Sequence, residues 1–257
     1  MTVVTRPDLS ARTMLSKSAV VGWDMCATKA GYELTERRPL ILTEKISFGS
    51  ALDAATEVLI VGRREGWTEK RVLAGAEDAI AQITERDGIP LPESELGVAV
   101  RGFWNDVMPT RDWSDVATQP EVTAHIAGLG DVQGHPDVVL VGEPWDVKSS
   151  RYKKDLPSVE LGLYAILLEE AYGTEVRQAG YFTWVRGYAK PRWEIQPWEI
   201  TSEARRWTWA RVRQYAQARD AGAFYGAPKY PQLCDGCQYN PAAGGPCQIA
   251  WNGEGNE

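Results

Sequence analysis

Two carboxylates and one lysine in the middle of the chain are spaced so that they could act together: Asp137, Asp146 and Lys148. The apolar segment 138–141 is followed by a Gly-Glu-Pro turn sequence and then by alternating apolar and polar residues, which predicts a β-hairpin. Side chains on a strand repeat every two residues, so Asp146 and Lys148 share one face. If the hairpin closes about residues 141 and 142, Asp137 lies opposite Asp146 and the three groups converge.

This trio suits metal-assisted hydrolysis of a phosphodiester. Carboxylate oxygens are hard ligands for Mg²⁺ or Mn²⁺, and such an ion polarises a phosphoryl group and lowers the pKa of a bound water. Lys148 would orient that water or stabilise the negative charge that develops on the phosphate. Asp and Lys two residues apart also occur on ordinary solvated strand faces, so a surface role is the alternative.

The chain has four cysteines, one near its start and three close together near its end: Cys26, Cys234, Cys237 and Cys247. Four thiolates in this arrangement can ligate a [4Fe–4S] cluster or a tetrahedral Zn²⁺, and the spacing does not choose between them. A disulfide framework is not expected, because the chain is long and residues 1–10 contain no apolar signal segment. These features predict a cytoplasmic protein.

Pro136-Asp137 and Asp146-Val147-Lys148 resemble the motif that gives the PD-(D/E)XK nuclease superfamily its name. The cysteines on both sides of this core are similar to those of its RecB-like iron–sulfur branch, which includes the CRISPR-associated exonucleases and the nuclease domain of AddB. The resemblance implies an α/β fold of the restriction-endonuclease type, with a central mixed β-sheet flanked by helices, a helical insertion and a C-terminal iron–sulfur segment. It also implies that the four cysteines ligate a [4Fe–4S] cluster that ties the ends of the domain together; zinc and four free buried thiols are the alternatives.

The resemblance extends to three further positions. The segment 48–54 is similar to a helix start where the family places a metal-binding histidine, but the aligned residue here is Asp53. Because aspartate suits a hard ion such as Mg²⁺, Asp53 is expected to be an additional ligand beside Asp137 and Asp146, and a solvated helix residue is the alternative. Glu160 and Tyr164 stand at the family's Gln-x-x-x-Tyr positions and are expected to assist catalysis from one helix face.

Other polar residues are weaker candidates. Glu121 precedes an apolar run, where related nucleases often place an acidic residue, so facing the site and lying at the surface are its two alternatives. Asp131 follows a glycine and reads as part of a turn between two strands, so Asp137 is preferred as the hairpin carboxylate. Neither His125 nor His135 has a partner pattern for catalysis, and both are expected to be ordinary core or surface residues.

The formal net charge of −7 counts against a broadly basic DNA-binding surface. Local basic segments remain, and the run Arg151-Tyr152-Lys153-Lys154, which follows the Asp146 strand, could meet the phosphates beside a scissile bond. A solvated basic loop is an equally good interpretation. No apolar stretch is long enough to cross a bilayer, so no membrane partner is expected.

Periodicity and capping residues predict helices over 16–31, 48–65, 68–88, 93–108, 158–172 and 201–221. Strands are predicted between 122 and 150, over 178–186 and over 192–196. We expect one RecB-like nuclease domain over 1–257, made of an N-terminal segment (1–47), a helical arch (48–116), a catalytic core (117–200) and a C-terminal helix with the cysteine cluster (201–257).

The sequence therefore predicts a Mg²⁺- or Mn²⁺-dependent DNA exonuclease that acts on single strands or duplex ends. Such enzymes serve recombination, repair, phage replication or CRISPR adaptation, where protein partners are also expected, and the sequence does not select one. A nucleic-acid-binding adaptor that keeps the fold but cuts poorly is the alternative, because Asp53 and Glu160 depart from the family's usual residues. A zinc-stapled endonuclease is a third interpretation.

Overall fold

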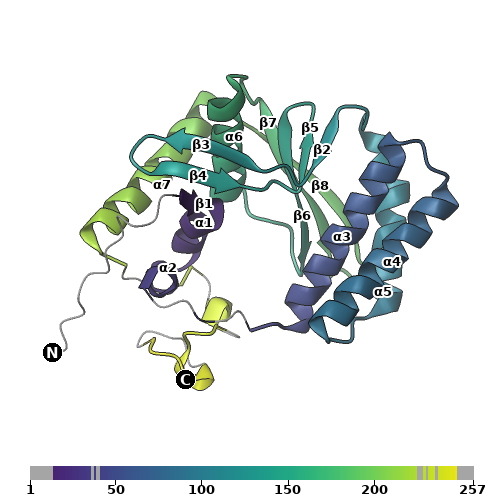
Figure 1. Cartoon of the computed structure of the whole chain (residues 1–257), viewed down its shortest axis with the longest axis horizontal. Helices are drawn as coiled ribbons and strands as arrows, with labels where there is room; N and C mark the ends of the chain where they lie inside the picture. Colours follow the sequence, from purple (N-terminus) through teal and green to yellow (C-terminus); the bar gives the residue numbers. More distant parts are fainter. Residues whose placement is uncertain are drawn as a thin grey trace.

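The computed structural model describes residues 14–35, 38, 41–224, 228–229, 231–234 and 237–247 (Figure 1). Within these ranges the strands form two mixed sheets, a larger one in the order β2-β5-β6-β7-β8 and a smaller one in the order β1-β4-β3. The strands are β1 (Met14–Ser16), β2 (Val116–Thr118), β3 (Val122–Ile126), β4 (Gly130–Gly134), β5 (Val138–Leu140), β6 (Glu143–Ser150), β7 (Gln178–Val185) and β8 (Arg192–Glu199).

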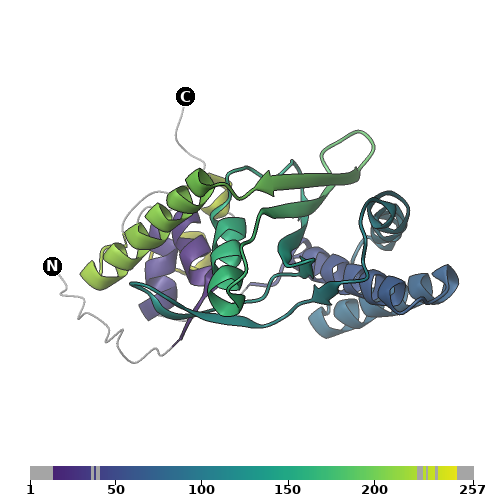
Figure 2. The ribbon, with the colours of Figure 1, turned by 90° about the horizontal axis from the view of Figure 1, so that it is seen from above.

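Helices cover both faces of the larger sheet (Figure 2). α3, α4 and α5 lie on one side, and α1, α6 and α7 lie on the other. The α-helices are α1 (Lys17–Met25), α2 (Ala27–Thr35), α3 (Glu44–Arg64), α4 (Glu69–Asp87), α5 (Glu93–Gly102), α6 (Val159–Tyr172) and α7 (Ser202–Ala221). This arrangement confirms the predicted α/β class with a mixed sheet between helices. No helix in the described ranges is long and apolar enough to cross a membrane.

Several helices begin and end where the sequence predicts, because their capping residues act as expected. The Thr68 hydroxyl accepts the Arg71 N–H at 3.4 Å at the start of α4, and Gly88 ends that helix with a φ of 64°. α6 is likewise capped by Ser158 and stopped by Gly173. The helix expected over 93–108 is α-helical only to its middle, after which the chain forms a π-helical turn (Phe103–Val107) and a 3-10 turn (Met108–Thr110).

One predicted helix is wrong, because the helix expected over 16–31 is two helices, α1 and α2, that meet at Cys26. Cys26 is extended, with φ −158° and ψ 100°, and its N–H donates to the Gly22 carbonyl at 2.8 Å. Ser16 occupies the N-cap position of α1, but its side chain makes no capping hydrogen bond. The break lets Cys26 line a cavity shared with the C-terminal segment.

β5 and β6 form the predicted hairpin. Leu140 pairs with Glu143 across a two-residue turn, and the same register, continued by one residue beyond Val138 and Trp145, places Asp137 opposite Asp146. The turn residues at 141 and 142 have φ values of 52° and 78°, and positive φ at both central positions is what a type I′ turn requires. The closure predicted from the sequence is therefore confirmed.

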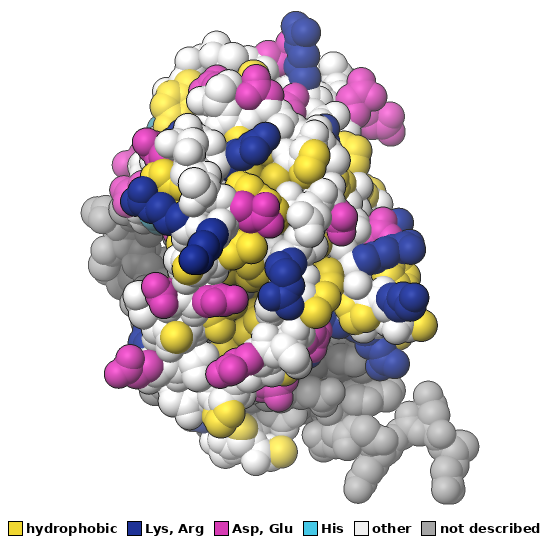
Figure 3. Space-filling view, turned by 90° about the vertical axis from the view of Figure 1, so that its right-hand side faces the viewer, with side chains coloured by type: hydrophobic (Ala, Val, Ile, Leu, Met, Phe, Trp, Pro, Cys, Tyr) yellow, Lys and Arg dark blue, Asp and Glu magenta, His cyan; other side chains and the backbone are white. Residues whose placement is uncertain are grey.

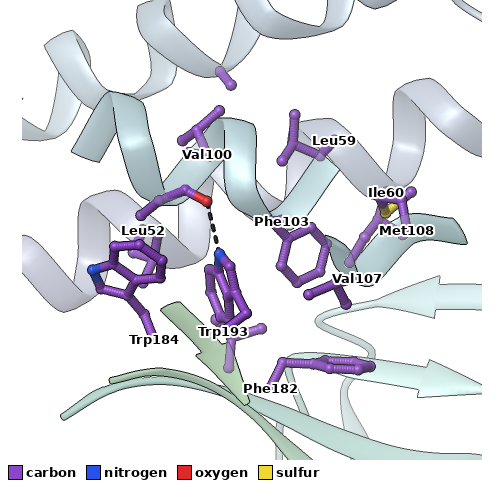
Figure 4. Packing of buried hydrophobic residues seen from close by; sticks show 14 of the residues in the cluster. Leu52, Leu59, Ile60, Val100, Phe103, Val107, Met108, Phe182, Trp184 and Trp193 are labelled. Atoms are coloured by element: carbon purple, nitrogen blue, oxygen red, sulfur yellow. Dashed lines mark hydrogen bonds between the residues drawn. The ribbon is translucent and has the colours of Figure 1, made fainter. Parts of the chain in front are cut away.

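The helical block expected as an arch packs on the larger sheet through a continuous apolar core (Figure 4). Phe103 meets Phe182 and Trp193 edge-to-face, with ring centroids 5.8 and 4.9 Å away. The Trp193 indole N–H donates to the Ala99 carbonyl of α5 at 2.7 Å. The outer surface of these helices shows acidic and basic side chains intermixed (Figure 3), so it is not a field of one sign.

Alternation along β6 sets which side chains enter that core. Trp145 and Val147 are buried in the core beneath α3, α4 and α5. Trp145 lies flat over Gly180, where an added Cβ would come within 2.3 Å of the indole ring, so this strand partner must be glycine. Because side chains alternate, Asp146 and Lys148 point to the opposite face, toward α6.

Candidate active site

Four carboxylates and one lysine come together where β6, α3 and α6 approach one another. The positive charge of the lysine acts to lower the pKa of each of these carboxylates. The group consists of Asp53 from α3, Asp137 from the loop before β5, Asp146 and Lys148 from β6, and Glu160 from the first turn of α6. The structure thus gathers the hairpin trio and two of the three further positions expected to assist it.

The trio is held by short contacts. The Val147 N–H donates to Oδ2 of Asp137 at 2.7 Å, which ties the hairpin carboxylate to the backbone of β6. Lys148 Nζ forms an ion pair with Oδ2 of Asp146 and lies 3.7 Å from Oε1 of Glu160. Asp146 is 1% exposed, so its charge depends on the cation beside it rather than on water.

Burial raises the pKa values of the aspartates in the site. Desolvation raises the pKa of Asp53 to about 7, and the negative charges of Asp146 and Glu160 add to this against the effect of Lys148. Desolvation likewise raises the pKa of Asp137 to about 6, and the charge of Asp53 adds to it. Burial and the charge of Glu160 raise the pKa of Asp146 well above its ordinary value. Raised carboxylate pKa values of this kind indicate a site that is short of positive charge.

Glu160 and Lys148 are both held in their charged forms. Burial opposes ionisation of Glu160, but the charges of Lys148 and Lys17 overcome it and lower the Glu160 pKa to about 2. Burial also opposes the charge on Lys148, yet three neighbouring carboxylates raise its pKa well above the ordinary lysine value. The lysine is therefore a permanent cation at neutral pH.

Lys17, the first residue of α1, belongs to the site although no sequence pattern marks it. Its Nζ lies 2.6 Å from Oε1 of Glu160 and 4.5 Å from the centroid of the Tyr164 ring. Glu160 and Tyr164 therefore share one face of α6, as their four-residue spacing predicts. Only a contact between segments 143 positions apart reveals Lys17, so local reasoning could not find it.

Two tyrosine hydroxyls brace the site. The Tyr164 hydroxyl donates to the His135 carbonyl at 2.6 Å, in the loop that carries Asp137, so this predicted site residue positions the loop. Tyr181, which the sequence reading does not single out, donates to Oε2 of Glu160 at 3.2 Å. Burial raises the pKa of both phenols well above the ordinary value, so both remain protonated donors.

The weaker sequence candidates lie elsewhere. Asp131 is not in a turn, because the turn is completed over 127–129 and Asp131 already belongs to β4. Its carboxylate meets Nδ1 of His125 at 3.0 Å, and both side chains are exposed. Glu121 is exposed just before β3.

The donor set fits a hard divalent cation. Asp53, Asp137 and Asp146 offer carboxylate oxygens, and their raised pKa values show negative charge that a proton or a metal ion must neutralise. Among the described residues, no three His, Cys, Asp or Glu side chains are already arranged around a single metal position. The ammonium of Lys148 instead contacts Asp146, so a cation that binds this carboxylate must compete with the lysine.

The four cysteines line one cavity between the N-terminal and C-terminal segments: Cys26, Cys234, Cys237 and Cys247. Burial raises the pKa of the Cys26 thiol, and the nearness of the other three adds to this. The Cys237 N–H donates to the Cys234 carbonyl at 3.2 Å, and the Cys247 N–H donates to the Tyr239 carbonyl at 2.9 Å. Among the described residues these thiols, like the carboxylates, do not already surround a single metal position, although thiolate sulfur is the donor that a [4Fe–4S] cluster or a tetrahedral zinc ion takes.

Comparison with known proteins gives a fold but no family. No protein-family model matches the chain, and no curated protein sequence matches it. A solved structure named "putative exonuclease", from Eubacterium rectale, has a similar fold, with a TM-score of 0.56 and 13% identity over 93% of each chain. The two chains therefore share a mixed α/β fold. A second structure, named SSO0001, is more distant, with a TM-score of 0.40 and 11% identity over 93% of this chain and 88% of that one.

Proposed function

We propose that this protein is a divalent-metal-dependent DNA exonuclease of the RecB-like iron–sulfur type, acting on single strands or duplex ends. The observation that carries the proposal is the meeting of Asp137, Asp146 and Lys148 in one buried site, in the hairpin register that turn position and alternation predict; these are the residues of the PD-(D/E)XK resemblance. The nuclease-like fold supports it.

Each residue of the site has a distinct task in this proposal. Asp53, Asp137 and Asp146 would hold a Mg²⁺ or Mn²⁺ ion, which would supply Lewis acidity and lower the pKa of a bound water. Lys148 remains charged, so it can orient the attacking water or neutralise the phosphate as negative charge develops. Glu160 anchors Lys148 from α6.

We also propose that the four cysteines ligate a [4Fe–4S] cluster with a structural role. The support is the single cavity that all four side chains line. Metal ligation adds to folding free energy, so the ligand would fix the C-terminal segment against α1 and α2. Metal analysis and a visible spectrum of anaerobically purified protein distinguish an iron–sulfur cluster from zinc, because the cluster absorbs near 400 nm and zinc does not.

Degradation of end-labelled single-stranded and duplex DNA with Mn²⁺ tests the function. The intact protein is expected to shorten at least one of these two substrates. The Lys148→Ala and Asp146→Ala variants are expected to degrade it roughly 100-fold or more slowly. Asp131→Ala is the matched control, since its carboxylate is exposed and lies outside the site. DNA binding without metal-dependent degradation by the intact protein would favour the adaptor, and cutting of circular DNA would favour an endonuclease.

A further inference from the structure

The basic run after β6 divides into two parts in the structure. Arg151, Tyr152 and Lys153 are exposed, and Lys153 Nζ forms an ion pair with Glu194 at 2.9 Å. Lys154 is half-buried instead, and the charges of the carboxylate site act on it. The fold therefore separates one lysine of this run from its neighbours.

The backbone of Lys154 is clamped by a single side chain from β8. Gln196 accepts the Lys154 N–H through Oε1 at 3.0 Å, and its Nε2 donates to the Lys154 carbonyl at 2.9 Å. The Thr183 hydroxyl of β7 donates to the same Oε1 at 3.0 Å, which fixes the amide. Both backbone polar groups of Lys154 are therefore hydrogen-bonded although the residue lies outside regular secondary structure. These bonds fix the position of the backbone that carries its side chain.

Lys154 is a partly desolvated cation. It forms no ion pair with any residue in the described ranges. Burial lowers its pKa, and the positive charges of Lys148 and of Lys45 in the first turn of α3 add to this, whereas the negative charges of Glu160 and Asp146 oppose the shift without reversing it. A half-buried ammonium group without an ion pair is costly for the fold, and it is suited to bind an anionic ligand.

The charge balance of the whole site points to the same ligand. Its four carboxylates are Asp53, Asp137, Asp146 and Glu160, and its three half-buried ammonium groups are Lys17, Lys148 and Lys154; Lys45 is exposed to solvent and is not counted. When all are ionised they leave one negative charge, which a divalent cation converts to one positive charge. A phosphodiester, with one negative charge, then neutralises the site.

We propose that Lys154 binds a backbone phosphate of the nucleic-acid substrate next to the scissile bond, and that Gln196 is the residue that positions it. This inference rests on the proposed function and extends it, because it assigns a substrate contact that lies outside the metal-binding carboxylates. The charge of Lys45 acts on Lys154, and this exposed lysine adds to the attraction for a phosphate backbone.

Equilibrium binding separates this contact from the chemistry. The probe is a fluorescein-labelled single-stranded oligonucleotide, followed by fluorescence anisotropy over a series of salt concentrations, with Ca²⁺ in place of the catalytic ion. Lys154→Met is expected to weaken binding about three- to tenfold and to reduce the slope of log affinity against log salt by about 0.7. Lys154→Arg is expected to bind like the intact protein, and Gln196→Leu is expected to weaken binding as Lys154→Met does.

Lys153→Met is the matched control, because it removes the neighbouring charge from an exposed side chain. It is expected to change affinity by less than twofold, and thermal unfolding shows whether each variant is folded. Intact protein that degrades DNA, combined with equal binding by Lys154→Met and Lys153→Met, overturns the phosphate contact alone. Intact protein that neither binds nor degrades DNA overturns the proposed function and this contact with it.

Discussion

Lys17 Nζ lies 2.6 Å from Oε1 of Glu160, so the first residue of α1 is joined to the first turn of α6. The two side chains are only 12% and 14% exposed, so this ion pair is not a screened surface contact. Glu160 also approaches Lys148 at 3.7 Å. The same helix α1 leads to Cys26, and the pair therefore links the active site to the segment that carries the first cysteine.

The first prediction concerns this ion pair. Lys17→Met leaves the Glu160 carboxylate buried with one partner fewer, so we expect a loss of about 2 kcal/mol in the free energy of unfolding and at least tenfold in activity. The double variant Lys17→Met/Glu160→Gln removes both charges and is expected to regain most of that stability. Urea unfolding and DNA degradation measure both effects, and a double variant no more stable than Lys17→Met would show that the two residues are not coupled.

The second prediction concerns pH and Asp53. Burial raises the pKa of Asp53 from 3.8 to about 7, so the folded protein binds this proton more tightly than the unfolded chain does. The resulting stabilisation is complete below about pH 4 and is lost as the pH rises to 7. In EDTA, the stability of Asp53→Asn relative to the intact protein should therefore rise by roughly 1–3 kcal/mol between pH 5 and pH 8. A difference in stability that stays constant over this range would contradict the assignment.

A third prediction concerns the hairpin turn. Val141 has a φ of 52°, which is unfavourable for a β-branched residue, and its side chain is 65% exposed. Val141→Asn is expected to increase the free energy of unfolding by about 0.5–1 kcal/mol without changing DNA degradation. Val98→Asn is the control, because Val98 is also exposed but lies within α5, where no such gain is expected. If the two substitutions change the free energy of unfolding equally, the positive φ of Val141 does not destabilise the turn.

A fourth prediction concerns the cysteine cavity. Cys26→Ser should abolish absorption near 400 nm and lower the melting temperature, because it removes the ligand that joins the early segment to the late one. Lys148→Ala should retain both the absorption and the melting temperature. Stoichiometric zinc in a colourless protein would show that the cysteines bind zinc and not an iron–sulfur cluster. A metal-free protein whose melting temperature is unchanged by Cys26→Ser would show that the cysteines bind no metal.

Local patterns were sufficient for much of the fold. Ser158 and Gly173 bound α6 as predicted, and the hairpin register that sets Asp137 opposite Asp146 follows from turn position and alternation alone. Such features depend on residues close in sequence, where period and capping chemistry act directly. The break between α1 and α2 at Cys26 is not predictable from local sequence, because no proline or glycine stands at it; Cys26 instead lines a cavity with residues from the far end of the chain.

The residues of the site likewise divide into those that local sequence indicates and those that only tertiary contacts reveal. The hairpin trio is visible as a spacing pattern, and Asp53 and Glu160 came from the family resemblance. Lys17 and Gln196 act through partners far away in sequence, and no spacing rule predicts which lysine or glutamine a distant strand or helix will meet. Contacts of this kind are properties of the packed structure.

Direct measurement of metal binding tests the central claim. Mn²⁺ titration followed by electron paramagnetic resonance should show a site in the intact protein whose affinity increases from pH 5.5 to 7.5, because Asp53 and Asp137 must lose protons to bind the ion. Asp146→Asn and Asp137→Asn are expected to bind at least about tenfold more weakly, and Asp131→Asn should bind like the intact protein. Undiminished Mn²⁺ affinity in Asp146→Asn and Asp137→Asn would contradict a metal site built on the hairpin.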